Sequence, residues 1–189
     1  MVQAFTILRK KYLWSAELYL AGAKESDIRD ALRERQIRVE EVDWQKIHLL
    51  GDLGSEKLTD YYNLCDVFCM PSYFEAYGLV FAEALTYGLP CIGRDKFAMS
   101  EFIEDGCTGR LISGEDAEEL ALDLWEVLQD PKYREEVERR REWYLREYSW
   151  DKVAQRICSV MEKNERDKDQ YRSAGAVSYT HLRAHETKA

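Results

Sequence analysis

Apolar residues along this chain recur at spacings that alternate between helical and strand patterns. Near its start, Ala4, Phe5, Leu8 and Tyr12 share one face within residues 2–13, which predicts an amphipathic helix. Short apolar runs then predict strands at residues 17–22, 46–50, 66–70, 91–93 and 109–112. The remaining stretches predict helices at residues 26–35, 55–63, 76–87, 115–128, 131–148 and 149–163, with a helical turn at 100–103.

This alternation of strands and helices predicts the fold class. It calls for right-handed βαβ units, and therefore for an α/β fold in which helices cover both faces of a parallel sheet. Ligands of such sheets bind in the crevice beyond the carboxyl ends of the strands. The chain opens inside a helix, so we expect that the first strand of the sheet is missing. Expected N-caps of the helices are Ser26 or Asp27, Ser55 and Ser149.

Composition and charge narrow the classes of function. The 189 residues are 46% apolar, as in a globular protein, and the formal net charge of -9 argues against a nucleic-acid surface. No apolar run approaches the ~20 residues that cross a bilayer, and Met1 precedes a charged helical segment, so we expect a cytoplasmic protein. Without any CxxC pair, buried thiols are favoured over a disulfide framework or a zinc site for Cys65, Cys69, Cys91, Cys107 and Cys158.

We expect three parts of the chain to differ in character. Residues 1–166 form the folded domain, residues 167–176 a disordered linker, and residues 177–189 a tail that is not native. The tail contains VSYTHLRAHET, which resembles the translation of a transposase-type sequencing adaptor. His48 is then the one native histidine, and a lone histidine in an apolar strand is typically a hydrogen-bonded core residue. These considerations favour neither a histidine-based catalytic site nor a metal site.

The candidate chemistry lies in residues 71–93, PSYFEAYGLVFAEALTYGLPCIG. Among 36 acidic residues, two glutamates eight positions apart mean little by themselves. Glu83, however, is flanked by Ala82 and Ala84 in a helix that is apolar nearly all round, where an unpaired carboxylate would be costly. We therefore expect Glu83 to be held by hydrogen-bond donors, while Glu75 lies in the turn before the helix.

The spacing of these residues suits a nucleoside diphosphosugar. Eight helical residues span at most ~12 Å, comparable with the reach from ribose to sugar in such a molecule. The free N–H groups at the helix start form an anion site for a diphosphate, and Gly78 lets the backbone approach it closely. Carboxylates on either side, Glu75 and Glu83, would accept hydrogen bonds from sugar and ribose hydroxyls.

The pattern PS-x-x-E-x-x-G-L-x-x-x-E-A-x-x-x-G-x-P, from Pro71 to Pro90, resembles the signature of the retaining glycosyltransferases of family 4. This is the glycosyl transferases group 1 domain of GT-B enzymes. Flanking segments agree with it, among them residues 48–51, 62–72 and 148–150. The resemblance covers about residues 2–163 and implies a Rossmann-like, nucleotide-sugar-binding domain, the C-terminal half of a GT-B enzyme.

The resemblance also implies roles for particular residues. Glu75 would contact the donor sugar and is the candidate catalytic residue, and Glu83 would hold the ribose. Gly78 and Leu79 would present backbone N–H groups to the diphosphate, with Tyr77 beside them. Such enzymes need no metal or further cofactor beyond a UDP- or GDP-sugar donor, and they retain the anomeric configuration. Stabilisation of the leaving group, and not a paired acid and base, would then drive the transfer.

The chain departs from the family pattern in two respects. Residues 96–101, KFAMSE, replace the usual Gly-Gly-x-x-Glu, which makes the loop near the donor sugar bulkier. The family's Gly-Arg-x(n)-Lys-Gly element and its acceptor-binding domain, which would receive a glycan or lipid, would precede Met1. We therefore expect the chain alone to be inactive. The alternatives are a non-catalytic interaction domain, or a GT-B epimerase or phosphorylase. Peripheral contact with the inner face of the membrane is an alternative to a fully cytoplasmic location.

Overall fold

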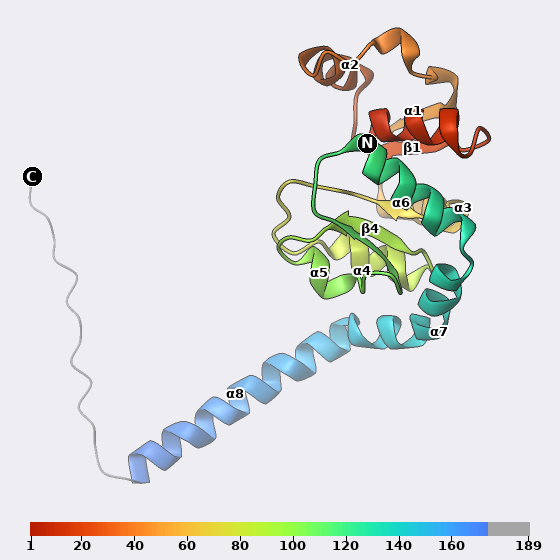
Figure 1. The fold of residues 1–189 in the computed structure, drawn as a ribbon. Coiled ribbons are helices and arrows are strands. Elements are labelled where there is room, and N and C mark those ends of the chain that lie inside the picture. The colour runs from red at the N-terminus through yellow and green to blue at the C-terminus, as the bar shows by residue number, and fades with distance from the viewer. Residues whose placement is uncertain (174–189) are drawn as a thin grey trace, which may run out of the picture. The chain divides into compact units, whose positions relative to one another are not determined.

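Eight α-helices and five strands alternate along residues 1–173, the part of the chain that this computed structural model describes, the side chains of residue 39 and of residues 165–173 excepted (Figure 1). The strands are β1 (Leu18–Ala21), β2 (Ile47–Gly51), β3 (Phe68–Cys69), β4 (Cys91–Arg94) and β5 (Gly109–Ile112). The helices are α1 (Val2–Lys11), α2 (Glu25–Glu34), α3 (Ser55–Leu64), α4 (Leu79–Thr86), α5 (Met99–Phe102), α6 (Ala117–Gln129), α7 (Lys132–Glu147) and α8 (Trp150–Ser173), with 3-10 turns at Val39–Glu41 and Trp44–Lys46.

The strands form two parallel sheets, which confirms the α/β class with parallel pairing. β1 pairs with β2, with Leu18 opposite Ile47. β4 lies between β3 and β5, so that Cys91 stands opposite both Phe68 and Gly109. The expected single sheet is therefore divided into a two-stranded and a three-stranded part.

The division falls between β1 and β3, each of which is paired on one side only within the described residues. In a doubly wound sheet the first strand lies between the second and the fourth. If the first strand is missing, β1 and β3 are the second and the fourth, and the gap is where that strand belongs. The missing strand itself stays a prediction.

Helices pack on both sides of the three-stranded sheet. Figure 1 shows α6 on one side of β4, and α4 with α5 on the other. α1 lies against α6, and Phe5 and Leu8 from α1 join Leu120, Leu124 and the β4 residue Ile92 in one hydrophobic core. On the other side of the sheet, the buried residues of α4 and α5 are Phe81, Ala82, Ala84, Leu85, Met99 and Phe102. This core supports the loops that follow β3, β4 and β5.

Two predicted helix caps are wrong. α2 has Lys24 as its N-cap, so Ser26 and Asp27 lie inside the first turn, and α3 has Gly54 as its N-cap, so Ser55 is its first residue. Neither cap residue forms a side-chain hydrogen bond to its helix. Both helix starts are exposed, so water can satisfy the N–H groups that a side-chain cap would otherwise serve.

Residues Met1–Leu145 form one compact unit, and a second begins at Arg146, where a single domain over residues 1–166 was expected. In the second unit, Ser149 Oγ accepts a hydrogen bond from the Lys152 N–H (3.2 Å), as predicted for a cap. Residues 167–173, expected in a disordered linker, belong to α8, because no glycine or proline interrupts the sequence between Trp150 and Ser173. Residues 174–176 of that linker and the tail at 177–189 lie outside the described residues.

Candidate functional site

The turn between β3 and α4 carries the predicted site. α4 begins at Leu79, three residues after the predicted start at Ala76, because Gly78 has a left-handed conformation (φ +79°, ψ 40°). Such a conformation is costly for a residue with a Cβ and does not continue a right-handed helix. Glu75 and Tyr77 therefore lie in the loop before α4. The Phe81 N–H donates a hydrogen bond to the Gly78 carbonyl (2.9 Å), whereas Leu79 and Val80, the first two residues of the helix, lie too near its start for their N–H groups to have an acceptor one turn back.

Glu75 and Gly78 pack against each other. A Cβ built on Gly78 would lie 3.1 Å from Cγ of Glu75 and 3.0 Å from a ring carbon of Phe81. Gly78 is buried, whereas Glu75 is half-buried. A side chain at position 78 would thus displace either the Glu75 carboxylate or the Phe81 ring. Glycine is needed here for its conformation and for the space.

Glu83 lies on the second turn of α4, about 6 Å further along the helix axis than Leu79. Its side chain is exposed, so the prediction of a buried carboxylate is wrong. Ala82 and Ala84 are buried, but successive helical residues point about 100° apart, so buried neighbours in sequence do not bury the residue between them. One donor does hold Glu83, since its Oε2 accepts a hydrogen bond from the Tyr62 hydroxyl (3.2 Å). Burial raises the pKa of the Tyr62 hydroxyl most, and the negative charge of Glu83 raises it further.

A cavity of about 370 Å³ is lined by the start of α1, by α2 and by residues at the carboxyl ends of β3, β4 and β5, but not by Glu75, Gly78 or Glu83. Its lining includes Pro71 and Tyr73 after β3, Arg94 at the end of β4 and Ile112 at the end of β5. This is the edge at which a parallel α/β sheet binds ligands, and Tyr73 stands two positions before Glu75. A larger cavity, of about 1030 Å³, is lined by residues that precede β3 and β4 and by α6 and α7, away from that edge.

Sequence reasoning missed Arg94, which joins the loops at this edge. The Arg94 side chain is buried, and its guanidinium donates hydrogen bonds to the carbonyls of Pro71 (3.1 Å) and Gly114 (2.6 Å). The guanidinium carbon lies 4.5 Å from the centre of the Tyr73 ring, whose hydroxyl accepts a hydrogen bond from Arg35 (3.0 Å). A lone arginine closing the apolar run CIGR was the available signal. Arg94 fixes the loops after β3 and β5 relative to β4.

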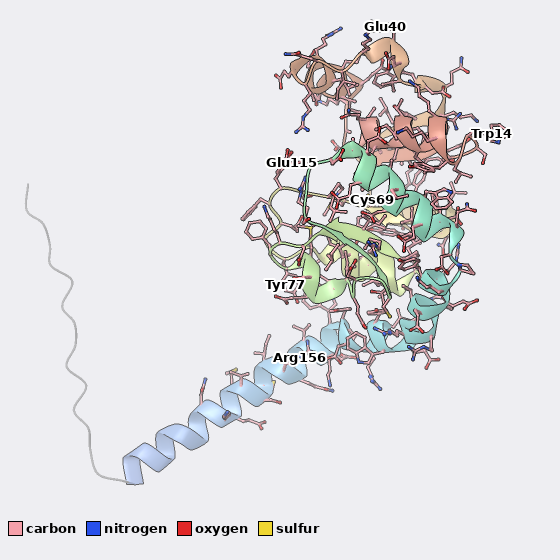
Figure 2. All side chains as sticks on the ribbon, in the orientation of Figure 1. Trp14, Glu40, Cys69, Tyr77, Glu115 and Arg156 are labelled. Atoms are coloured by element: carbon pink, nitrogen blue, oxygen red, sulfur yellow. The ribbon has the colours of Figure 1, made fainter. Side chains whose placement is uncertain are left out.

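Large apolar side chains are unusually exposed on the loops around Glu75. Phe74 and Phe97 meet edge to face with ring centres 5.1 Å apart. Figure 2 labels Tyr77, which packs its ring edge to face on Phe102 (5.6 Å). The exposed members of this group are Tyr73, Phe74, Tyr77, Leu79 and Phe97. All five belong to the loops after β3 and β4 or to the first residue of α4.

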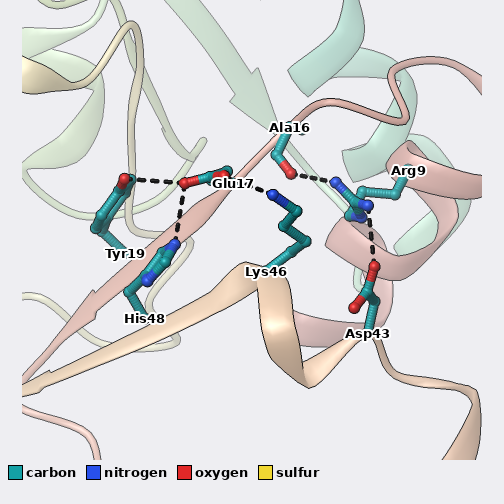
Figure 3. A network of polar contacts seen from close by, with 7 residues as sticks. All are labelled: Arg9, Ala16, Glu17, Tyr19, Asp43, Lys46 and His48. Carbon is teal, nitrogen blue, oxygen red and sulfur yellow. Dashed lines mark hydrogen bonds and ion pairs between the residues drawn. The ribbon is translucent and has the colours of Figure 1, made fainter.

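A second polar cluster lies at the start of β1 and β2 (Figure 3). Glu17 accepts hydrogen bonds from Lys46 (2.8 Å) and Tyr19 (3.1 Å) and contacts His48 Nε2 at 3.0 Å. These hydrogen bonds lower the pKa of Glu17 to about 2, and the one from Lys46 has the largest effect. His48 is hydrogen-bonded as predicted, but it is half-exposed and not a core residue. The alternating pattern of the strand points this side chain away from the core.

The remaining predictions concern metals, thiols and membrane spans. Among the described residues, no group of three or more His, Cys, Asp or Glu side chains could hold a metal ion. The cysteines are free; Cys91 is buried and Cys158 is exposed, so the prediction of buried thiols holds only in part. Burial raises the pKa of the Cys69 thiol to about 12. Within residues 1–173 no helix is both long and apolar enough to span a bilayer.

The family model described as "Glycosyl transferases group 1" matches residues 1–144. A D-inositol 3-phosphate glycosyltransferase of Kribbella flavida is 32% identical over 98 residues, which cover 52% of this chain and 23% of that protein. The chain spans about a quarter of the length of the first curated relatives it matches.

Two solved structures are similar to the chain in fold. The pneumococcal O-GlcNAc transferase GtfA in complex with UDP and GlcNAc has a TM-score of 0.64 and 25% identity, covering 85% of this chain and 32% of that one. Anabaena Alr3699/HepE in complex with UDP and glucose has a TM-score of 0.69 and 18% identity, covering 86% of this chain and 44% of that one. The second likeness concerns the fold alone.

Proposed function

Because this chain belongs to the glycosyl transferases group 1 family, we propose that it forms the donor-binding wall of a retaining glycosyltransferase. The donor is a nucleoside diphosphosugar, with UDP or GDP as the nucleotide. The observation that carries this proposal is the turn in which Gly78, left-handed and buried, separates Glu75 from α4. The O-GlcNAc transferase GtfA, which is similar to this chain, forms a complex with UDP and GlcNAc, and this supports the choice of ligand.

The start of α4 is proposed to hold the diphosphate. The free N–H groups of Leu79 and Val80 and the positive end of the helix dipole favour negative charge there. Gly78 carries no side chain that would keep a phosphate away from the backbone. Charge that develops on the departing nucleotide during transfer meets the same donors, which lowers the barrier without a metal ion.

The two carboxylates then serve different parts of the donor. Glu75, in the loop before α4, accepts hydrogen bonds from the sugar hydroxyls. Glu83, one helical turn further along, accepts hydrogen bonds from the ribose hydroxyls. The Tyr62 hydroxyl bonds to Oε2 of Glu83, which orients the carboxylate and leaves Oε1 for the ligand. Since Glu83 is exposed, this role costs the fold nothing when the ligand is absent.

The placement of the two carboxylates differs from that in a glycosidase. A glycosidase needs two carboxyl groups facing each other across the scissile bond. Here Glu75 precedes the helix and Glu83 stands on its surface beside Tyr62, so each serves its own part of one extended ligand. The acceptor, a glycan or a lipid, is proposed to enter from another part of the full-length protein.

The two alternative functions differ from the proposal in what they require. A non-catalytic interaction domain of the same fold has no need for Gly78 or for an exposed Glu83. A GT-B epimerase would act on the sugar nucleotide without a sugar acceptor, whereas a GT-B phosphorylase would cleave a glycosidic bond with inorganic phosphate and would need no sugar nucleotide. Product analysis with the full-length protein distinguishes transfer from epimerisation, because only transfer consumes the acceptor.

The experiment that tests the proposal compares Glu83→Ala with Glu56→Ala in the full-length protein. Both glutamates are exposed on helices, but Glu56 lies on α3. We expect Glu83→Ala to lower kcat/KM by at least about 100-fold, the range seen when a positioned charged contact is lost, while the thermal midpoint falls only slightly through the lost hydrogen bond to Tyr62. Glu56→Ala should leave both unchanged. Near-normal turnover in Glu83→Ala would remove the ribose assignment.

A further inference from the structure

The aromatic pair Phe74 and Phe97 belongs to two different loops of the first unit. Phe74 directly precedes Glu75 after β3, and Phe97 follows β4. Their rings meet edge to face with centres 5.1 Å apart, yet the two residues are 69% and 53% exposed. Packing against each other thus leaves most of both rings in water. Adjacent apolar rings with this much open surface are uncommon unless they bind something.

The backbone conformation of Phe97 also indicates that the exposed ring pair binds a ligand. Among the described residues, only Gln36 and Phe97 combine a side chain with a positive φ, 58° and 56°. Gln36 follows the C-cap of α2, where a left-handed residue commonly ends a helix. Phe97 follows strand β4 and does not end a helix, and a bulky residue in this conformation is strained. The chain therefore holds an exposed ring where glycine would be more stable.

The neighbourhood of the pair indicates what the rings bind. Glu75, the residue that follows Phe74, supplies carboxylate oxygens that accept hydrogen bonds from hydroxyl groups, and the faces of the two rings carry partial negative charge. A pyranose offers hydroxyls around its edge and weakly positive C–H groups on its faces. An aromatic platform beside a carboxylate matches both features.

We propose that Phe74 and Phe97 form an aromatic platform that packs against the C–H face of the donor's pyranose ring and selects among donor sugars. This inference rests on the proposed function, since it places the sugar of the same donor. Phe97 is the specificity-determining residue, because its ring is carried by a loop that a smaller residue would leave open. Phe74 supports it from the side of Glu75.

The test compares nucleotide with nucleotide-sugar binding in this chain. We would titrate the ¹⁵N-labelled protein with UDP, GDP, UDP-glucose, UDP-galactose, UDP-GlcNAc and GDP-mannose, up to millimolar concentrations. The wild-type chain should bind at least one sugar nucleotide about three- to tenfold more tightly than the matching free nucleotide. In Phe97→Gly this ratio should fall to about one, with the affinity for the free nucleotide unchanged.

Control variants distinguish loss of the aromatic platform from misfolding and from failure of the proposed function. Phe97→Gly relieves the backbone strain, so its thermal midpoint should equal or exceed that of wild type. Phe74→Ala should reduce the same ratio, and Trp14→Ala, an exposed aromatic residue outside the site, should not. A ratio that persists in Phe97→Gly overturns the platform and leaves the donor site intact. No binding of either free nucleotide by wild type would contradict the proposed function, and the platform with it.

Discussion

The two sheets of the first unit differ in how completely they are buried. All four residues of β4 are buried, whereas β1 has three half-buried residues and one exposed residue. β4 has strands on both sides and helices on both faces, while β1 is paired with β2 alone within the described residues. The loops that carry the candidate site extend from the more buried sheet. The candidate site therefore rests on the more buried and more rigid of the two sheets, as precise positioning of a ligand requires.

The largest expected difference between the two sheets concerns their cores. Phe81 of α4 is fully buried and meets Phe68 of β3 edge to face, whereas Leu20 of β1 is half-buried. Phe81→Ala should lower the free energy of unfolding by about 3–5 kcal/mol, and Leu20→Ala by roughly half as much. Guanidinium unfolding with unchanged m-values measures both. An equal or larger loss from Leu20→Ala would contradict the comparison.

Gly22, after β1, and Gly78, before α4, both have a positive φ but differ in their surroundings. Gly78 and Gly22 have φ values of +79° and +73°, but a Cβ on Gly22 would meet nothing within 4 Å. Gly22→Ala should therefore cost only the left-handed strain, about 1–2 kcal/mol. Gly78→Ala adds contacts with Phe81 and Glu75, so its loss of stability should be larger. It should also abolish nucleotide binding, which Gly22→Ala should leave unchanged.

Equal stability of the Gly78→Ala and Gly22→Ala variants would contradict the tight packing around Gly78. If Gly78→Ala unfolds at the same denaturant concentration as Gly22→Ala, Gly78 is not packed as the structure has it. Calorimetry with UDP on both variants then decides whether the backbone at the start of α4 still binds the diphosphate.

A smaller effect is expected from the hydroxyl that orients Glu83. Tyr62→Phe keeps the ring, which stacks on Tyr87 at 5.2 Å, and removes the hydrogen bond to the Glu83 carboxylate. We expect a loss of about 1 kcal/mol in stability or less, and a several-fold weaker affinity for UDP. Tyr87→Phe, which removes a hydrogen bond to Thr59 (3.1 Å), is the matched control and should not change affinity. Equal UDP affinities in the two variants would remove the positioning role of Tyr62.

The smallest effect concerns the exposed cluster at Glu17 on the two-stranded side. The pKa of Glu17 is about 2 in the folded chain, below the ordinary value of 4.5. A lowered folded-state pKa gives stability that is present above the ordinary pKa and is lost as the pH falls toward the folded-state value. The difference in thermal midpoint between wild type and Glu17→Gln should therefore shrink between pH 4.5 and about 2. A constant difference over that range would show that the cluster at Glu17 contributes no pH-dependent stability.

The order and type of the elements could be predicted from sequence because the periodic patterns are strong. The strand at Gly109–Ile112 has the predicted bounds, and the other strands fall within or beside theirs. The start of α4 could not be predicted, since an apolar pattern over residues 76–87 contains nothing that marks Gly78 as left-handed. The division into two sheets was likewise invisible, because strand pairing depends on contacts between distant segments.

Part of the candidate site could likewise be predicted from the sequence, and part could not. Glu75, Gly78 and Glu83 could be named from the sequence, because the apolar surroundings of Glu83 and the resemblance to the family motif both mark this segment. The exposure of Glu83 and its bond to Tyr62 depend on how α4 packs against α3, which no local pattern records. Arg94 and the strained Phe97 were missed for the same reason, since a buried guanidinium and a positive φ arise only in the folded chain.

The central claim is that the start of α4, on the more buried sheet, binds the diphosphate of the donor. The most direct test is a titration of the ¹⁵N-labelled chain with UDP and with GDP, followed by assignment of the amide shifts. We expect the largest shifts at Gly78, Leu79 and Val80, with a second group near Glu83 and little change in β1 and β2. Largest shifts in β1 and β2, or at the larger cavity at the opposite end of the strands, would contradict the account.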